Sequence, residues 1–108
     1  MFRGLLFNQR CLVPSSGFYE WTHDEAHIRC HCRQPGEPIT WMAGLYDRGE
    51  ENPRFAILTT AANFSIAPIH DRMPLVIPTK DGLNWLNDSM EAVSLLGREP
   101  AALSVRVV

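Results

Sequence analysis

Residues 10–21 read RCLVPSSGFYEW, and this stretch gives the first indication of a β-rich fold. Two apolar and aromatic segments, 11–14 and 17–21, flank a Pro-Ser-Ser-Gly turn. β-Branched and aromatic residues favour extended strands, whereas Pro, Ser and Gly favour turns. The stretch therefore predicts two strands joined by a tight change of direction.

Apolar runs of strand length recur along the rest of the chain, with turn residues between them. The expected strands cover residues 26–33, 39–46, 55–60, 74–78 and 103–108. The run 55–60 has the clearest pattern of a buried strand, and its prolines confine 74–78 to a short or edge strand. Because strands come first and helices late, we expect a β-rich α+β fold with a largely antiparallel sheet.

Two short helices are expected near the C-terminus, over residues 79–86 and 89–96. Thr79 and Ser89 are the candidate N-caps, and Glu91 lies early in the second helix, where a negative charge is favourable. Gly97 is a stop signal, and Gly82 weakens the first helix.

Composition limits the classes of function. The chain has 108 residues, 45% hydrophobic and 20% charged, which suits one globular domain. No run approaches the ~20 apolar residues of a membrane span and no signal peptide is evident, so we expect a cytoplasmic protein with no membrane partner. Three cysteines, two of them one residue apart, indicate reduced thiols. A net charge of −2 attracts no polyanion overall, so any contact with DNA has to be local.

Glu20 is unusual because its carboxylate stands between Tyr19 and Trp21 in a strand-like run. With a period of two it shares a strand face with Phe18. If that face is interior, the carboxylate is desolvated and suited to acid or base chemistry. The alternative is a surface glutamate paired with an arginine. Trp21 can equally pack in the core or stack on a nucleic-acid base.

The triplet His70-Asp71-Arg72 lies between apolar and proline-bounded segments. An imidazole can exchange a proton near neutral pH, a neighbouring carboxylate can fix its tautomer, and a guanidinium offers a planar fork for a phosphate. The alternative is a solvated turn with an Asp–Arg pair.

Metal-competent side chains are dense between residues 23 and 32. On a strand, alternation separates the two cysteines of this segment from its third histidine, and the spacing fits no closed zinc pattern. We therefore expect no metal and no other cofactor at these residues, which are His23, His27, Cys30, His31 and Cys32. Cys11, in an apolar segment, is expected to pack as a small hydrophobe.

Five blocks of the sequence occur in the order and approximate spacing of one known family. They are residues 10–14 (RCLVP), 17–21 (GFYEW), 42–46 (MAGLY), 59–63 (TTAAN) and 69–74 (IHDRMP). Together they resemble the SRAP family, whose members include bacterial and eukaryotic abasic-site processing proteins. The resemblance implies a β-rich domain with a groove for single-stranded DNA, and covalent chemistry on the aldehyde of an abasic site.

The resemblance also implies roles for individual residues. Glu20 matches a residue that assists proton transfers at the attacking amine and the sugar, and His70 matches one that assists opening of the sugar ring. Arg72 matches a phosphate contact. Further DNA contacts are implied for Trp21, Thr59 and Arg3. The implied partner is single-stranded DNA containing abasic sites, which would place the protein at the nucleoid, and the implied activities are crosslinking, a lyase type of reaction and self-processing as a peptidase.

One departure from the family concerns the nucleophile. The family uses an N-terminal cysteine whose amine and thiol form a thiazolidine with the aldehyde, and position 2 here is Phe2. The segment Met1–Arg3 resembles the middle of the family's chain. We therefore expect residues 1–108 to be a partial domain that lacks the N-terminal part and the final strand. The alternatives are a non-covalent or inactive remnant scaffold, a thiol peptidase-like protein, and a metal-binding module built on residues 23–32.

Overall fold

The computed structural model describes residues 2–49 and 51–108, with side chains from Gly4 onward. Within these residues the chain forms antiparallel strands and short helices, so the expected α+β class is confirmed. None of the described helices is long and apolar enough to span a bilayer. The first sheet contains β1 (Arg10–Ser15), β4 (Thr40–Asp47), β5 (Arg54–Ile57) and β8 (Val76–Ile77).

The remaining strands form two further sheets. The second sheet has the order β2 (Phe18–Trp21), β3 (Arg29–Arg33) and β9 (Ser104–Val107), and the third is the pair β6 (Thr59–Ala61) and β7 (Arg72–Pro74). The helices are α1 (Phe2–Asn8), the 3-10 turn η1 (Thr79–Asp81), α2 (Gly82–Asn87) and α3 (Ser89–Gly97).

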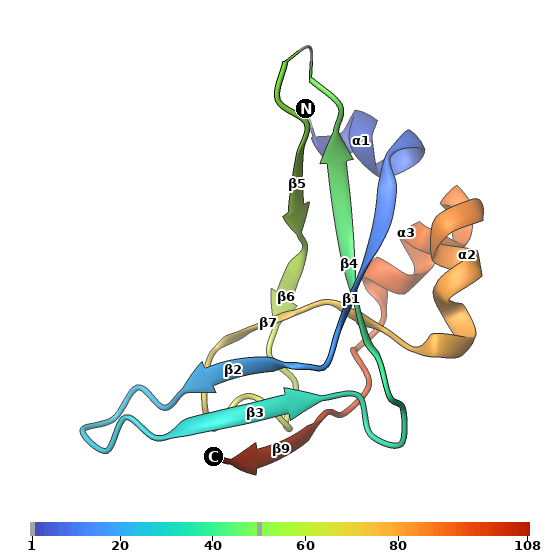
Figure 1. Ribbon diagram of the computed structural model, residues 1–108. Coiled ribbons are helices and arrows are strands. Elements are labelled where there is room, and N and C mark those ends of the chain that lie inside the picture. Colours follow the sequence, from blue (N-terminus) through green and yellow to red (C-terminus); the bar gives the residue numbers. More distant parts are fainter. Residues whose placement is uncertain (1, 50) are drawn as a thin grey trace.

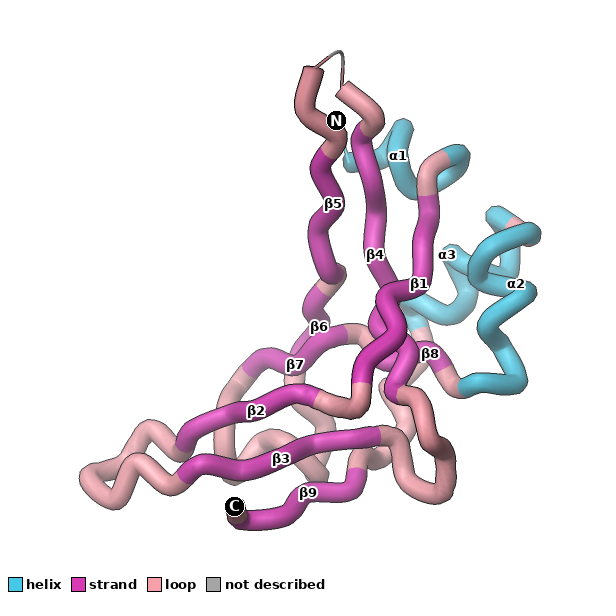
Figure 2. The backbone as a smooth tube through the Cα atoms, in the orientation of Figure 1, coloured by secondary structure: helices cyan, strands magenta, loops and turns pink. Residues whose placement is uncertain are grey.

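The molecule has two arms. Figure 1 shows the β4–β5 hairpin standing upright with the helices beside β1 and β4, and the β2–β3–β9 sheet lying across the base. The radius of gyration is 14.6 Å, against about 13 Å for a compact domain of this length. The shape is therefore extended, and the tube in Figure 2 shows the loop between β2 and β3 at the far end of the lower arm.

The turn at Gly17 carries the chain from one arm to the other. Its φ of +124° lies in a region that glycine adopts readily and other residues avoid. A Cβ added there would lie 2.5 Å from the Cys32 carbonyl oxygen and 2.6 Å from Nε2 of His31. Ser15 fixes the start of the turn, because its Oγ donates to the Thr40 carbonyl at 2.8 Å and accepts from the Gly17 N–H at 3.2 Å.

Strand β4 separates two hydrophobic clusters, since its side chains alternate between them. Met42 belongs to a cluster with Cys30 and Cys32 of β3, residues 66 and 69 of the β6–β7 loop, and residues 73, 76 and 103. Its neighbour Ala43 packs with the helices. The helical cluster is centred on the fully buried Trp85, whose Nε1–H donates to the Cys11 carbonyl at 2.9 Å.

Arg10, the first residue of β1, forms hydrogen bonds with residues of α1, α2 and α3. Its Nη1 donates to the Leu6 carbonyl at 2.6 Å and to Ser89 Oγ at 3.0 Å, and its Nε donates to the Trp85 carbonyl. Nη2 adds a bond to the Leu86 carbonyl at 3.3 Å. These carbonyls lie at the ends of α1 and α2, where no helical N–H follows to satisfy them.

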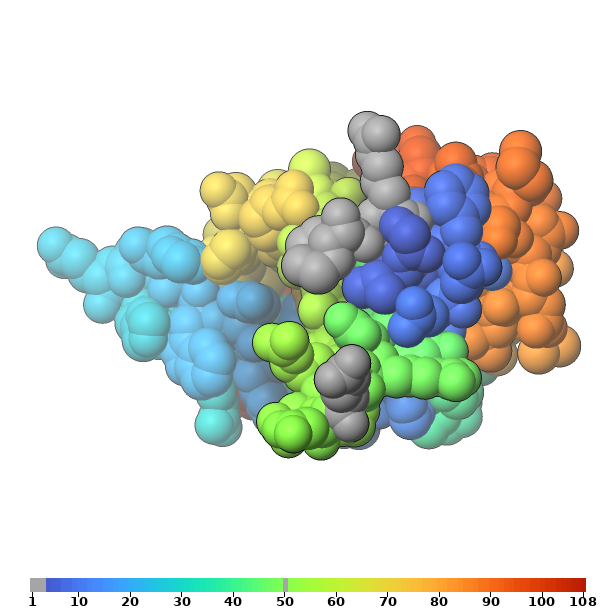
Figure 3. Space-filling model, turned by 90° about the horizontal axis from the view of Figure 1, so that it is seen from above, coloured from blue at the N-terminus to red at the C-terminus, as the bar shows by residue number. Residues whose placement is uncertain are grey.

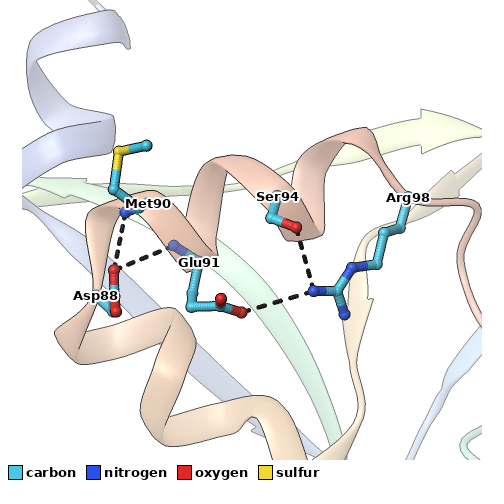
Figure 4. Close-up of polar contacts among 5 residues, drawn as sticks. All are labelled: Asp88, Met90, Glu91, Ser94 and Arg98. Atoms are coloured by element: carbon cyan, nitrogen blue, oxygen red, sulfur yellow. Dashed lines mark hydrogen bonds and ion pairs between the residues drawn. The ribbon is translucent and has the colours of Figure 1, made fainter.

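The C-terminal helices occur where they are expected, but the predicted N-caps are wrong. Asp88 caps α3, accepting from the N–H groups of Met90 at 3.0 Å and Glu91 at 3.1 Å, so Ser89 is already helical (Figure 4). A carboxylate accepts more strongly than a hydroxyl and suits the positive end of the helix dipole. Thr79 makes no capping bond. Its Oγ1 accepts instead from Gln34 at 3.3 Å, and α2 begins at Gly82.

Two further expectations differ from the structure. Helix α1 was absent from the sequence prediction, and the run 55–60 is not a buried strand. It breaks at Leu58 into β5 and β6, because Leu58 bonds through its backbone to both Ala43 and Leu75. Strand β5 is exposed and Phe55 keeps 63% of its surface accessible. An apolar run predicts an extended strand, but it does not say whether another element covers it.

Candidate functional site

An open cleft of about 550 Å³ lies between the β2–β3 loop and the loop that joins β6 to β7. In the space-filling view of Figure 3, the segment near residue 70 (yellow) adjoins the projecting β2–β3 hairpin (light blue). The β2–β3 loop contributes Thr22, His23 and Asp24 to the cleft, and the other wall consists of residues 67–71.

The β2–β3 loop is held in shape by its own polar groups. Thr22 Oγ1 donates to Asp24 Oδ1 at 2.8 Å and accepts from the Ile28 N–H at 2.7 Å. Hydrogen bonds from the Thr22 hydroxyl and the His27 N–H hold the pKa of Asp24 below its ordinary value. Asp24 is therefore charged near neutral pH, and its bonds fix the loop that presents His23.

The loop between β6 and β7, residues 62–71, is anchored by Asn63. The side chain of Asn63 is 5% exposed, and its Nδ2 donates to the carbonyls of Pro100 at 2.8 Å and Ala101 at 3.1 Å. Its Oδ1 accepts from the Ser65 N–H at 3.0 Å. Ile66 and Ile69 pack into the core below. Since buried polar bonds and apolar packing both hold this loop, His70 has a defined position.

Two contacts meet at Nδ1 of His70. The Arg72 backbone N–H lies 3.0 Å from it, and Oδ1 of Asp71 lies 3.2 Å from it. A backbone N–H can only donate, so Nδ1 has to act as an acceptor and the neutral ring carries its proton on Nε2. The side chain of Asp71 is 93% exposed and solvated, so the N–H bond decides the tautomer. In this tautomer the Nε2–H group of His70 can donate a hydrogen bond.

His23 packs edge-on against His70, with ring centroids 4.7 Å apart and an interplanar angle of 70°. The sequence singled out His23 only as a metal candidate. Nothing in the local pattern indicates that a loop of the second sheet reaches a histidine 47 positions further along the chain, because that contact depends on tertiary packing.

Glu20 is half-buried on the face of β2 that it shares with Phe18, as the alternation predicts. It pairs in register with Cys30, and this face covers Cys30 and Cys32. Burial, with contributions from the neighbouring Cys30 and the Glu20 carboxylate, raises the pKa of Cys32 to about 11. Glu20 lies two residues before Thr22 of the cleft but is not among the residues that line it. A common reacting centre for Glu20 and His70 stays a prediction.

Arg72 and Thr59, which the sequence named separately as DNA contacts, touch each other. Nη2 of Arg72 donates to Thr59 Oγ1 at 3.0 Å across the β6–β7 pair, and both residues are exposed. The guanidinium is therefore oriented toward solvent with donors to spare, and it follows His70 by two residues. The Asp71–Arg72 pair that was the alternative for this segment is not formed among the described residues.

Trp21 lies on the opposite face of β2 from Glu20 and is 41% exposed. It stacks on His27, with centroids 6.3 Å apart and planes inclined by 23°. An accessible indole face is compatible with base stacking. The side chain of Arg3, the remaining predicted DNA contact, lies outside the described residues.

The cysteines are all free thiols, as the sequence indicates. Cys30 and Cys32 are buried, and burial raises the pKa of the Cys11 thiol. A catalytic thiol needs a lowered pKa and access to substrate, so the thiol peptidase alternative gains no support. Alternation along β3 separates His31 from the two buried cysteines, as predicted. Among the described residues, no group of three or more His, Cys, Asp or Glu side chains is placed to hold a metal.

Comparison with known proteins gives the family. The family model described as SOS response associated peptidase (SRAP) matches residues 1–108, and the chain belongs to this family. A similar protein, "Abasic site processing protein YoqW" of Bacillus subtilis, is 33% identical over 93 residues, which cover 80% of this chain and 42% of the relative. "Abasic site processing protein YedK" of Escherichia coli is 31% identical over 96 residues, covering 83% and 43%. The chain therefore spans less than half the length of these relatives.

Solved structures agree with the fold. A crystal structure of a protein from Bacteroides thetaiotaomicron has a TM-score of 0.84 at 35% identity and covers 99% of this chain and 52% of its own. A protein from Bordetella bronchiseptica has a TM-score of 0.82 at 22% identity, covering 99% and 58%. The second likeness concerns the fold alone.

Proposed function

We propose that residues 1–108 form part of an abasic-site processing protein, and that the loop carrying His70 and Arg72 binds single-stranded DNA at the lesion. The observation that carries the proposal is the tautomer of the His70 ring. Its Nδ1 is occupied by a backbone N–H, which leaves a proton on Nε2 beside an open cleft. Two residues later, Arg72 presents an oriented guanidinium.

The chemistry of an abasic site explains the need for such groups. The sugar exists mainly as a closed ring, and opening it to the aldehyde moves one proton from the C1 hydroxyl and delivers one to the ring oxygen. His70 is proposed to donate a hydrogen bond from Nε2–H to the ring oxygen, which stabilises the negative charge that develops there while the ring oxygen takes its proton from water. When an amine then attacks the aldehyde, loss of water from the adduct needs another proton, and Glu20 is the group proposed to deliver it.

Arg72 and Thr59 are proposed to hold a phosphate next to the reacting sugar. A guanidinium binds phosphate through two parallel N–H bonds, and a hydroxyl can add a third. None of the three cysteines supplies the nucleophile that the family resemblance implies, because each has its backbone nitrogen in an amide bond. We therefore assign to these residues DNA binding and proton transfer, and not nucleophilic attack.

The test compares affinities for two oligonucleotides that differ only in one abasic site, measured by fluorescence anisotropy. The wild-type protein is expected to bind the abasic oligonucleotide more tightly. His70→Ala should reduce that preference, and Arg72→Gln should weaken binding to both oligonucleotides and reduce the salt slope by about 0.7, as for one lost phosphate contact on a single strand.

Arg54→Gln serves as the control, because it removes an exposed arginine of the upright β4–β5 hairpin (Figure 1) that does not line the cleft. It should leave the preference for the abasic site unchanged. Equal affinity of the wild-type protein for the two oligonucleotides would contradict the proposal and favour a remnant scaffold.

A further inference from the structure

The outer face of the β2–β3–β9 sheet gathers basic and aromatic side chains. Alternation along β3 points Cys30 and Cys32 into the core and their neighbours outward. The lower sheet in Figure 1 therefore has one apolar face, which also carries Glu20, and one polar face. The polar face, called the outer face below, consists of Tyr19, Trp21, Arg29, His31, Arg33, Ser104 and Arg106.

Strand register brings these side chains into one patch. His31 lies opposite Tyr19 on one side and Arg106 on the other, and Arg33 lies opposite Ser104. A shallow hollow of about 220 Å³ is lined by His31, Arg33, Ser104 and Arg106. At the other end of the patch, the guanidinium of Arg29 lies 5.2 Å from the centroid of the Tyr19 ring.

The positive charge of the outer face is not balanced locally. Arg29, Arg33 and Arg106 are exposed, and none makes an ion pair among the residues that the structure describes. Strands β3 and β9 contain no carboxylate, and the only one in β2, Glu20, lies on the opposite face. In a chain with a net charge of −2, three of the ten basic residues thus lie together.

We propose that the outer face is a second nucleic-acid surface, which binds the sugar-phosphate backbone independently of the lesion. Residues two apart on a strand face are about 6.6 Å apart, so Arg29 and Arg33 span about 13 Å. A nucleic-acid strand carries one negative charge per nucleotide, so a span of about 13 Å brings more than one phosphate within reach of the arginines. Tyr19 and Trp21 border the patch and offer rings to unpaired bases.

The choice of nucleic acid as the occupant rests on the proposed function, but the surface itself rests on charge and register. Three planar guanidinium groups, which have no carboxylate partner within residues 4–49 and 51–108, match the bidentate geometry of phosphates. Contacts of this kind add affinity without reading sequence. The outer face would therefore hold undamaged DNA as well as abasic DNA.

The test uses the triple variant Arg29→Gln/Arg33→Gln/Arg106→Gln and undamaged single-stranded DNA. Anisotropy titrations between 50 and 200 mM KCl measure the salt slope. Three phosphate contacts on a single strand contribute about 2 units to the slope, or about 20-fold in affinity over that range. The triple variant should lose this salt dependence.

The control is Arg48→Gln/Arg54→Gln/Arg98→Gln, which changes the net charge equally. Its substitutions lie in the β4–β5 hairpin and at the end of α3, so the control should keep the salt dependence of the wild-type protein.

The outcomes separate this proposal from the function proposed for the His70 loop. A preference for abasic DNA that persists in the triple variant, with a flattened slope, supports the outer face. If the wild-type protein shows no preference but the triple variant still flattens the slope, the lesion site fails and the outer face stands. An unchanged slope in the triple variant, an equal loss in the control, or equally strong binding of a poly-glutamate peptide to the outer face would overturn the proposal.

Discussion

The helical side of the first sheet and the β2–β3–β9 sheet use their side chains differently. The helical side buries Trp85 completely and satisfies the ends of its helices through Arg10 and Asp88. The second sheet buries only one face and leaves arginines and aromatic rings in solvent. From this contrast we infer that stability resides mainly in the first region, and we propose that DNA binds at the second sheet and the adjoining β6–β7 loop, with Gly17 as the link.

Trp85→Ala should cause the largest loss of stability, and it should destabilise the first region without altering the DNA-binding residues. Removing a fully buried tryptophan and its hydrogen bond to Cys11 is expected to cost about 3–5 kcal/mol. Urea unfolding followed by circular dichroism measures the loss, and Trp85→Phe should cost less because most of the volume remains. DNA affinity per folded molecule should not change. A parallel loss of affinity in the milder variant would show that the two regions are not separate.

Gly17→Ala should affect both regions. The new methyl group meets the Cys32 carbonyl at 2.5 Å in a backbone conformation unfavourable for alanine, and such strain costs about 1–3 kcal/mol. Because the turn aims β2, displacement of Glu20 and Trp21 should also weaken DNA binding. Ser16→Ala, one position earlier, provides the matched control. Unaltered stability of Gly17→Ala would mean that the turn relaxes without cost.

Asp88→Ala should have the smallest measurable effect on stability. Loss of the N-cap bonds to Met90 and Glu91 is expected to cost about 1 kcal/mol. The matched control on the same helix is Arg98→Ala, which removes an exposed ion pair of 3.6 Å with Glu91 (Figure 4) and should cost about 0–0.5 kcal/mol. Equal costs in thermal unfolding would refute the assignment of Asp88 as the cap.

Local patterns predicted much of the fold. The strands around the 10–21 turn, the alternation that separates Cys32 from His31, and the positions of α2 and α3 all depend on short-range preferences. The exposure of Phe55 could not be predicted, because an apolar run does not reveal whether it is covered. The break at Leu58 arises from backbone bonds to Ala43 and Leu75, which are distant in sequence.

The residues of the candidate site also fall into two groups, those that the sequence identified and those whose contacts depend on tertiary packing. Glu20, His70 and Arg72 were identified from their chemistry and from the family resemblance. The contact of Arg72 with Thr59 and that of His23 with His70 depend on how strands pair and loops pack, and neither has a local signal. Asn63 was present in a family block, but its role as the anchor of the His70 loop became visible only through its bonds to residues 100 and 101.

Chemical-shift mapping tests whether the β2–β3 loop and the β6–β7 loop bind abasic DNA. Amide spectra of the ¹⁵N-labelled protein are recorded during titration with a single-stranded oligonucleotide that contains one abasic site. We expect the largest shifts at residues 20–24, 59 and 67–72, with smaller shifts on the rest of the outer face and none in α2 and α3. Shifts concentrated in the helices, or an absence of shifts at residues 67–72 under saturating DNA, would contradict it.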